Sequence, residues 1–421
     1  MIGIPDAKIA PVAQLPAPLE VAEHDGVRDA LQFFTREKRW INERHLEICR
    51  IPAPTFQEQE RAAYLAGRLG ELGYEAQIDR AGNVVAPLVF ERGAPFVALT
   101  AHLDTVLAPR VPDGIELRPN GVLAGPGVAD NGAGLAGLLA VARALKASPA
   151  LSGCTHNLLL AANTGEEGEG NLFGMRYLCR QSSFARRISS FLVLDGAATD
   201  HITTQAIGSR RFEITVSGPG GHSWSDHGMA NPAHALARAI TLLTDRPLPD
   251  GARSSLNVGV FQAGGSVNAI PAEARAKVDI RSESNGSIDR IVAGVEESVR
   301  TAVDEENRRA SGAAAAFRVR EIGSRPAAEL PAESRLLACL RAVDAHFGIR
   351  SHLDRASTDA NIPLSMGREA VAIGAGGQGG GAHTPAEWFN PEGRDLGLKR
   401  IFLSLVLLLR GAGPDLPANG S

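Results

Sequence analysis

The stretch PFVALTAHLD, residues 95–104, joins an apolar run to a His-x-Asp motif. A short apolar run bounded by polar residues predicts a buried strand, and it places His102 and Asp104 at the end of that strand. Two further apolar runs, 155–162 and 191–194, are bounded by Gly, Asp or Asn, and helical patterns at 134–147 and 172–179 separate the runs. Strands that alternate with helices predict an α/β fold with a mixed, largely parallel sheet flanked by helices.

Five short segments carry polar residues at the ends of predicted strands or in the turns after them. They are TAHLD at 100–104, GVADN at 127–131, TGEEG at 164–168, LDG at 194–196 and GAHTP at 381–385. Their imidazoles and carboxylates, without thiolates, suit zinc, with manganese or cobalt as possible substitutes. Five ligands with one shared carboxylate are enough for two ions about 3.5–4 Å apart. The predicted ligands are His102, Asp130, Glu167, Asp195 and His383.

Two neighbours of these ligands have expected roles. Asp104 leaves the strand on the same face as His102, so its carboxylate can accept the second imidazole N–H and fix the tautomer. Glu166 stands beside Glu167, and adjacent carboxylates repel each other unless a cation lies between them or one is protonated. With Glu167 on the metal, Glu166 is free to act as a general base towards water.

Each motif taken alone has a structural alternative. His102 could be a hydrogen-bonded loop histidine, Asp130 could cap the helix that follows it, and the Glu166 pair could be a solvated acidic turn. Gly132, Gly134 and Gly137 also spell the glycine pattern of dinucleotide-binding sites. That interpretation fails because a Gly-Pro segment rather than a strand precedes the pattern, and no acidic residue follows at the expected distance.

Composition excludes several classes of partner. A chain of 421 residues with 44% hydrophobic content can fold into two or three domains. The net charge is −4 with scattered Lys and Arg, so we expect no nucleic-acid partner. The four isolated cysteines are typical of reduced thiols in the cytoplasm. The first 30 residues do not resemble a signal peptide, and the apolar run at 401–409 is too short to span a membrane.

The chain is expected to contain an inserted domain. Residues 208–322 follow a βαββαβ pattern, which predicts a small α+β sandwich. The zinc-binding domain would then be discontinuous, with residues 27–207 and 323–413, because His383 follows the insertion and the other four ligands precede it. One helical pattern covers 27–50 and a second covers 57–72. Residues 1–26 are expected to form an arm, and 414–421 a tail.

These segments in this order resemble the di-zinc metallopeptidase family that includes peptidase T, glutamate carboxypeptidase, the aminoacylases, acetylornithine deacetylase and succinyl-diaminopimelate desuccinylase. The resemblance covers about residues 27–411. It implies that His102 and Asp195 hold one zinc, that Glu167 and His383 hold the other, and that Asp130 bridges them. It also implies that Glu166 is the general acid/base and that the peptide bond after Asp130 is cis.

The insertion resembles the dimerisation or lid domain of that family, whose signature is GPGGH at 218–222. The resemblance implies a homodimer in which His222 steadies the oxyanion, in relatives from the partner subunit. It also implies that Asn268 and Arg281 contact the substrate. Their structural alternatives are turn positions for His222 and Asn268, and an ion pair with Glu273 or Asp279 for Arg281. The segment STDAN at 357–361 resembles a Gly-Thr-Asp-Ala segment of the family, with Ser357 in place of glycine.

The resemblance implies amide hydrolysis. Asp at position 195 and the Thr-Asp-Ala-Asn segment favour an exopeptidase of aminopeptidase or di/tripeptidase type that acts on small peptides. An N-acyl-amino-acid deacylase or a carboxypeptidase is the alternative on the same scaffold. A non-catalytic binding protein is a further alternative, although Glu166 and all five ligands are present.

Overall fold

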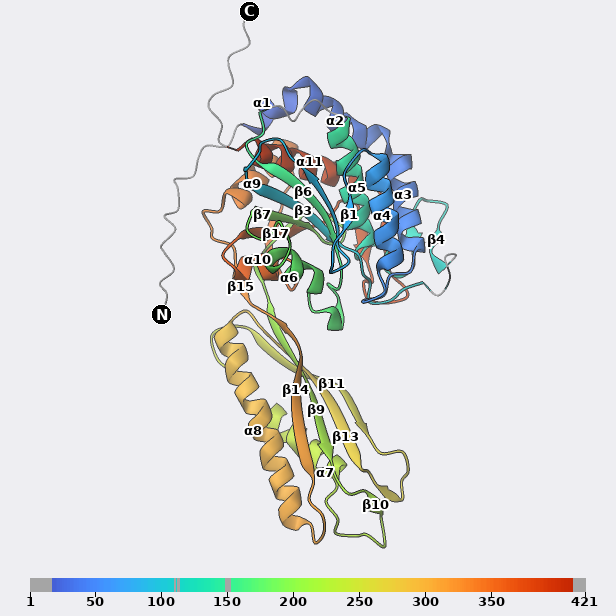
Figure 1. The fold of residues 1–421 in the computed structure, drawn as a ribbon, viewed down its shortest axis with the longest axis vertical. Coiled ribbons are helices and arrows are strands. Elements are labelled where there is room, and N and C mark those ends of the chain that lie inside the picture. Colours follow the sequence, from blue (N-terminus) through green and yellow to red (C-terminus); the bar gives the residue numbers. More distant parts are fainter. Residues whose placement is uncertain (1–16, 110, 112–113, 148–152, 412–421) are drawn as a thin grey trace, which may run out of the picture. The chain divides into compact units, whose positions relative to one another are not determined.

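The computed structural model describes residues 17–109, 111, 114–147 and 153–411, which form two compact units (Figure 1). Unit 1 comprises the described residues up to 204, residues 330–354 and the described residues from 358 onward. Unit 2 comprises residues 205–329 and 355–357. The division at 207 and 323 predicted from the sequence stays a prediction. Residues 1–16 of the predicted arm and the predicted tail lie outside the described residues.

The main sheet has a parallel centre and antiparallel edges. Its strand order is β1-β2-β6-β3-β7-β17-β8-β15, and β16 pairs with β8. The β6, β3, β7 and β17 strands pair in parallel, whereas β1, β2, β8 and β15 pair antiparallel. These strands are β1 Gln77–Ile78, β2 Val84–Leu88, β3 Phe96–His102, β6 Asn157–Asn163, β7 Ile188–Leu194, β8 His201–Ala206, β15 Ala328–Glu329, β16 His352–Ala356 and β17 Glu369–Ile373.

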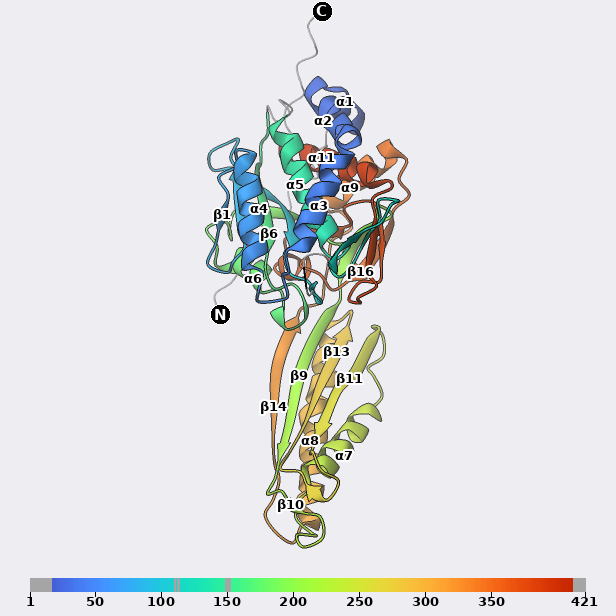
Figure 2. The ribbon, with the colours of Figure 1, turned by 90° about the vertical axis from the view of Figure 1, so that its right-hand side faces the viewer.

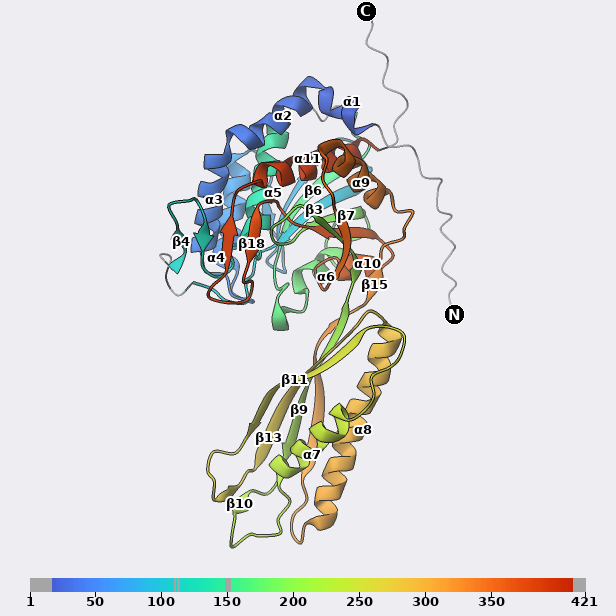
Figure 3. The ribbon, with the colours of Figure 1, turned by 180° about the vertical axis from the view of Figure 1, so that it is seen from behind.

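The central strands are apolar because the sheet is covered on both faces. All seven residues of β3 and all seven of β6 are buried. Helix α5 (Gly132–Lys146) packs on β3 and β7, α11 (Arg394–Arg410) packs on β3, and α9 (Arg335–Phe347) packs on β17. Helix α10 (Asn361–Ser365) also packs on β17, next to α6 (Phe173–Arg180) (Figure 3). The α/β class and the mixed sheet flanked by helices, predicted from the sequence, are confirmed.

Unit 1 contains nine of the helices in the described residues. They are α1 Pro18–Glu23, α2 Asp25–Arg36, α3 Lys38–Arg50, α4 Gln59–Glu71, α5 Gly132–Lys146, α6 Phe173–Arg180, α9 Arg335–Phe347, α10 Asn361–Ser365 and α11 Arg394–Arg410. No helix in the described ranges is long and apolar enough to cross a membrane.

The N-terminal region adds detail to two expectations from the sequence. The helix expected over 27–50 is divided at Glu37, where the backbone leaves the helical region and α2 gives way to α3. The expected arm contains helix α1, which begins at Pro18. This helix packs against α2, α9 and α11. The sequence pattern there is weak, so these short helices depend on tertiary packing for their stability.

A small four-stranded sheet carries one of the predicted ligands. Its order is β18-β19-β5-β4, with β18 Gln378–Gly380, β19 Trp388–Asn390, β5 Leu123–Ala124 and β4 Glu116–Leu117. The β18 and β19 strands form an antiparallel hairpin whose loop contains His383. Since β19 also pairs with β5, this hairpin lies beside the segment that leads to Asp130.

Unit 2 is an antiparallel sheet with two helices on one face (Figure 2). The sheet order is β11-β13-β9-β14, with β11 Ser254–Ala263, β13 Glu273–Ser282, β9 Gly208–Ser217 and β14 Ala316–Arg325. Helices α7 Pro232–Thr244 and α8 Asn285–Arg309 cover it, and the apolar residues between them form one core. A two-stranded ladder of β10 Gly221–His222 and β12 Ala269–Ile270 lies in the same unit.

Candidate metal centre

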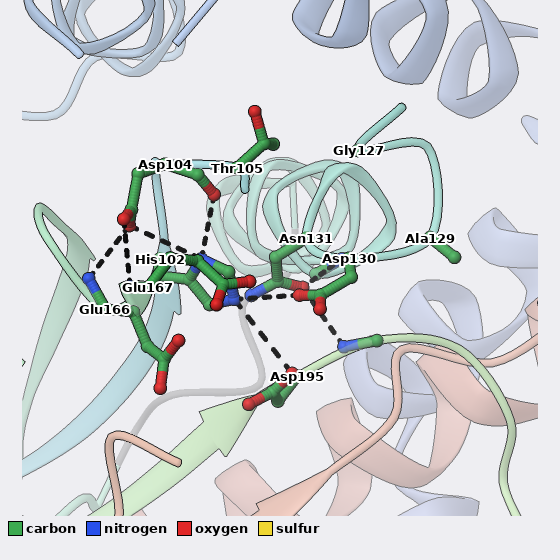
Figure 4. A network of polar contacts seen from close by, with 12 residues as sticks. His102, Asp104, Thr105, Gly127, Ala129, Asp130, Asn131, Glu166, Glu167 and Asp195 are labelled. Carbon is green, nitrogen blue, oxygen red and sulfur yellow. Dashed lines mark hydrogen bonds and ion pairs between the residues drawn. The ribbon is translucent and has the colours of Figure 1, made fainter. Parts of the chain in front are cut away.

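Three predicted ligands come from neighbouring parallel strands of the main sheet. His102 is the last residue of β3, Glu167 follows β6, and Asp195 follows β7. Because β6, β3 and β7 run in parallel, their carboxyl ends meet at one edge of the sheet. Asp130 reaches this edge from the turn before α5 (Figure 4). The loop between β18 and β19 brings His383 to Asp130.

The five ligands form two groups that share Asp130. The Asp130 Oδ1 atom lies 3.0 Å from Nε2 of His102, which is 4.0 Å from Oδ1 of Asp195. The Asp130 Oδ2 atom lies 3.1 Å from Nε2 of His383, which is 3.0 Å from Oε1 of Glu167. Ligand atoms of His102, Asp130 and Glu167 all lie within 4.8 Å of one another. The two oxygens of Asp130 therefore face different imidazoles.

Charges at the centre shift the pKa values of its members. Burial, followed by the neighbouring Asp130, raises the pKa of Asp195 to about 7. Burial opposes the charge on His102, but the nearby carboxylates of Asp104 and Asp130 still hold its pKa well above the usual value. Hydrogen bonds with Asp130 and Glu167 raise the pKa of His383 to about 10. These pKa shifts show that the carboxylates lie close together, an arrangement that positive charge between them would stabilise.

The donor set fits divalent cations. Each group offers one imidazole, one carboxylate of its own and one oxygen of Asp130, and none of the five ligands is a thiol. Nitrogen and oxygen donors of this kind suit zinc, cobalt and manganese. Cations would also relieve the repulsion between Asp130 and Asp195, which adds to burial in raising the pKa of Asp195. The identity of the metal stays a proposal.

Asp104 acts on its neighbours differently from the sequence prediction. Nδ1 of His102 makes its hydrogen bond, at 3.0 Å, with the backbone carbonyl of Asp104, and the Asp104 carboxylate is 3.6 Å away. The carboxylate instead accepts the backbone N–H groups of Glu166 and Glu167, both at 2.9 Å, and the hydroxyl of Thr55. A buried carboxylate is best satisfied by several N–H donors, which explains the preference. Asp104 thus positions Glu166 and Glu167 (Figure 4).

Asn131 caps helix α5, so Asp130 does not need to. The Asn131 side-chain oxygen accepts the N–H of Gly134 and also that of Gly196, while its amide donates to the carbonyl of Leu194. Asn131 therefore ties the turn of Asp130 to the residues on both sides of Asp195. The peptide bond between Asp130 and Asn131 is cis, as the resemblance implied.

Glu387 is a residue of the centre that the sequence analysis missed. Its buried carboxylate accepts the N–H groups of Gly127, Ala129 and Asp130 at 2.7 to 2.8 Å. Burial raises the pKa of Glu387 above its ordinary value, although these hydrogen bonds oppose the shift. An acidic residue directly before the aromatic pair Trp388 and Phe389 is the one signal in the sequence that could have indicated a buried role.

His222 and Asn268 lie together in unit 2. His222 pairs with Ala269 in the ladder of β10 and β12, and the N–H of Ser223 donates to the carbonyl of Asn268. Nδ1 of His222 accepts the N–H groups of Trp224 and Ser225, at 3.2 and 3.4 Å. Since Nδ1 is an acceptor, a neutral imidazole carries its proton on Nε2 and presents a donor there.

Arg281 stands apart from these two residues, near the C-terminal end of β13. Its Nε donates to Oδ2 of Asp279 at 2.7 Å, and Arg211 binds the other oxygen of the same carboxylate. The ion pair with Asp279 that the sequence analysis named as the alternative is therefore present. Arg281 remains 45% exposed, so the pair does not bury its guanidinium. Roles of His222, Asn268 and Arg281 in substrate binding stay proposals.

Two family models match parts of the chain. Residues 205–307 match the peptidase dimerisation domain of the M20 type, and residues 83–238 match peptidase family M28. A curated relative is the succinyl-diaminopimelate desuccinylase of Paracoccus denitrificans (strain Pd 1222), which is 29% identical over 58% of this chain and 69% of its own length. Among the curated relatives compared, the aligned part spans between 50% and 70% of the relative's length.

Solved structures share the fold over nearly their whole length. The aminopeptidase PepT of Bacillus cereus ATCC 10987 superposes with a TM-score of 0.68 at 18% identity, covering 88% of this chain and 98% of that chain. The YXEP protein of Bacillus subtilis, described as a dinuclear metal binding peptidase from the M20 family, gives a TM-score of 0.61 at 17% identity, covering 90% and 99%. At these identities the likeness shows the fold.

Proposed function

We propose that this chain belongs to the metallopeptidases with an M20-type dimerisation domain. On this premise, we propose that it is a two-metal hydrolase, which cleaves the amide bond of small peptides. One observation carries the proposal. The two carboxylate oxygens of Asp130 face two different imidazoles, at 3.0 and 3.1 Å, and each imidazole has a further carboxylate beside it. A shared carboxylate between two ligand groups is the arrangement that a pair of cations requires.

In this proposal His102 and Asp195 hold one cation, Glu167 and His383 hold the other, and Asp130 binds both. The bound cations would polarise the carbonyl of the substrate and lower the pKa of a bound water to about 7. Zinc is the proposed metal, two ions per subunit, with cobalt or manganese as substitutes.

Glu166 is the proposed general base and acid. Its backbone is fixed by the hydrogen bond to Asp104, and its side chain is buried beside the ligand Glu167. It would take a proton from the attacking water and deliver it to the leaving amine. A positioned group of this kind typically contributes 10²–10⁴-fold to the rate.

His222 is the proposed donor to the oxyanion. The hydrogen bonds at its Nδ1 leave Nε2–H as the group that would donate, and the residue is exposed in unit 2. A single donor of this type is worth about 3–4 kcal/mol of transition-state stabilisation. Asn268 and Arg281 are proposed to bind the substrate, and Arg281 would select a carboxylate through its guanidinium.

The choice of amide is the finer part of the proposal. We favour an exopeptidase of aminopeptidase or di/tripeptidase type, because residue 195 is Asp and STDAN resembles peptidase T. Deacylation of an N-acyl-amino acid is the second candidate, which the similarity to a desuccinylase favours. A metal-loaded protein offered a free-amine tripeptide and an N-acylated amino acid separates the two. If the metal-loaded protein hydrolyses no peptide and no N-acyl-amino acid in a broad panel, the result would favour the non-catalytic alternative.

A homodimer through the insertion is also proposed. Support comes from the match of residues 205–307 to a peptidase dimerisation domain. In the described sheet of unit 2, β11 pairs with β13 on one side and forms an edge, and an edge strand offers backbone groups to a second chain. Analytical ultracentrifugation would measure the mass in solution, and a monomer at micromolar concentration would contradict it.

A cytoplasmic location is proposed from the thiol chemistry. Cys49, Cys154, Cys179 and Cys339 are all buried and free of disulfides. Buried reduced thiols are typical of a reducing compartment. Fractionation of cells that produce the protein would test the location directly.

Metal analysis of two variants tests the assignment of roles. Glu166→Ala should lower turnover by 10²-fold or more while both metals stay bound, because Glu166 is not a ligand in the proposal. His383→Ala should lose metal, because it removes a ligand of one cation. The metal content is measured by atomic emission after gel filtration. Loss of metal from the Glu166 variant would refute its assignment as the base.

A further inference from the structure

We propose that Glu387 is a positioning residue that ties the loop of His383 to the turn of Asp130 and so sets the spacing of these two ligands. The inference rests on the proposed function, since it concerns the same pair of cations. The hydrogen bonds of its carboxylate go to backbone N–H groups, so it would act through the backbone that carries the ligands.

The carboxylate of Glu387 is enclosed by the turn that ends in Asp130. Its Oε2 accepts the N–H of Gly127 at 2.7 Å, and its Oε1 accepts those of Ala129 and Asp130 at 2.7 and 2.8 Å. Three donors within four consecutive residues form a concave anion site of the kind that binds phosphate elsewhere. Here a side chain of the same protein fills it, and Glu387 is 2% exposed.

The charge on Glu387 is compensated by this turn. Glu387 is buried, and burial of a carboxylate is costly unless N–H groups satisfy it. The backbone also contributes, because the N–H of Gly125 donates to the Glu387 carbonyl at 2.8 Å. Removal of the carboxylate would leave three N–H groups of the turn without their partner.

The same residue also fixes the position of His383. Only three residues separate the two, and the loop between β18 and β19 is closed by backbone hydrogen bonds from Thr384 to Gly381 and from Glu387 to Thr384. A short closed loop transmits the position of one end to the other. Glu387 therefore holds both sides of the 3.1 Å contact between His383 and Asp130.

Two other side chains make equivalent ties between ligand segments. Asp104 joins the segment of His102 to the N–H of Glu167, and Asn131 joins Asp130 to the residues around Asp195. Of these three ties, the one made by Glu387 includes His383. A variant at Glu387 should therefore weaken the cation group that contains His383 more than the group that contains His102.

Calorimetric titration of the metal-free protein with Zn²⁺ tests the inference. The wild type should bind two ions per chain. Glu387→Gln keeps the size of the side chain but turns an amide N–H₂ towards one backbone N–H. We expect this variant to bind one of the two ions 10- to 100-fold more weakly, which is the usual scale for residues that support metal ligands. Glu387→Ala should weaken it further, because all three hydrogen bonds are lost.

Glu306→Gln is the matched control. Glu306 is a buried carboxylate of unit 2 that accepts the N–H of Asn231 at 3.0 Å and binds Arg238. Its substitution should change the stability of the protein but not the affinity for Zn²⁺. Thermal unfolding of each metal-free variant identifies any variant that fails to fold, and Glu387→Gln then carries the test.

Two outcomes would overturn the positioning role. In one, both Glu387 variants bind two ions with the affinity of the wild type. In the other, the variants unfold at lower temperature when metal-free but keep the wild-type affinity, which is the result of a purely structural role. Failure of the proposed function would give a different result. In that case the wild type binds two ions but cleaves neither peptides nor acyl-amino acids.

Discussion

His45 is a neutral base held inside unit 1. It is fully buried in α3, its Nε2 donates to the carbonyl of Val128 at 2.7 Å, and Arg394 donates to its Nδ1. Burial and then the Arg394 cation hold the pKa of His45 well below its ordinary value of 6.5. Below pH 6.5 an unfolded chain binds this proton and the folded chain does not, so the free energy of unfolding falls as the pH falls.

We expect His45→Gln to reduce this acid sensitivity. Glutamine can donate and accept in the same place without titrating, whereas one such histidine contributes up to about 1.4 kcal/mol per pH unit below pH 6.5. Urea unfolding of the metal-free protein between pH 7.5 and 5.5 measures the slope. Equal slopes for wild type and variant would show that His45 takes up its proton in the folded state.

At the scale of elements, the apolar periodicity predicted the central strands and the long helices, because burial on both sides leaves a continuous apolar run. The strands β3, β6 and β7 each overlap a predicted run. The hairpin of β18 and β19 was not predicted, since each strand is three residues long and β18 is glycine-rich. Likewise, the ligands could be predicted from residue type, but the roles of Asn131 and Glu387 depend on which backbone N–H groups face them.

The close approach of α3 and α5 gives a prediction at this scale. A Cβ atom added to Gly132, at the start of α5, would lie 2.3 Å from Sγ of Cys49 and 2.7 Å from the carbonyl oxygen of Gly127. We expect Gly132→Ala to destabilise the metal-free protein by about 1–3 kcal/mol, the usual cost of overpacking. Urea unfolding measures the change.

Gly67 in α4 is the matched control for that substitution. No atom lies within 4 Å of a Cβ added there. Gly67→Ala should therefore raise the free energy of unfolding by up to about 1 kcal/mol, because alanine loses less backbone entropy in a helix. A loss of stability at Gly67 similar to that at Gly132 would contradict the packing argument.

At the scale of the whole molecule, the two units have separate cores, and all five predicted ligands belong to unit 1. A chelator should therefore lower the unfolding temperature of unit 1 and leave that of unit 2 unchanged. At a free metal concentration 100 times Kd, one ion adds about 2.7 kcal/mol to the folded state. Differential scanning calorimetry with and without chelator measures both transitions. An equal shift of both transitions, or no shift of either, would contradict the prediction.

The interruption of unit 1 by unit 2 has a consequence for biosynthesis. A ribosome makes His102, Asp130, Glu167 and Asp195 before the insertion, and it makes His383 and Glu387 after the insertion. A growing polypeptide can thus gather four of its metal-binding groups early, but the whole insertion must be translated before the set is complete. A nascent chain that stops within the insertion would therefore carry an open, incomplete centre.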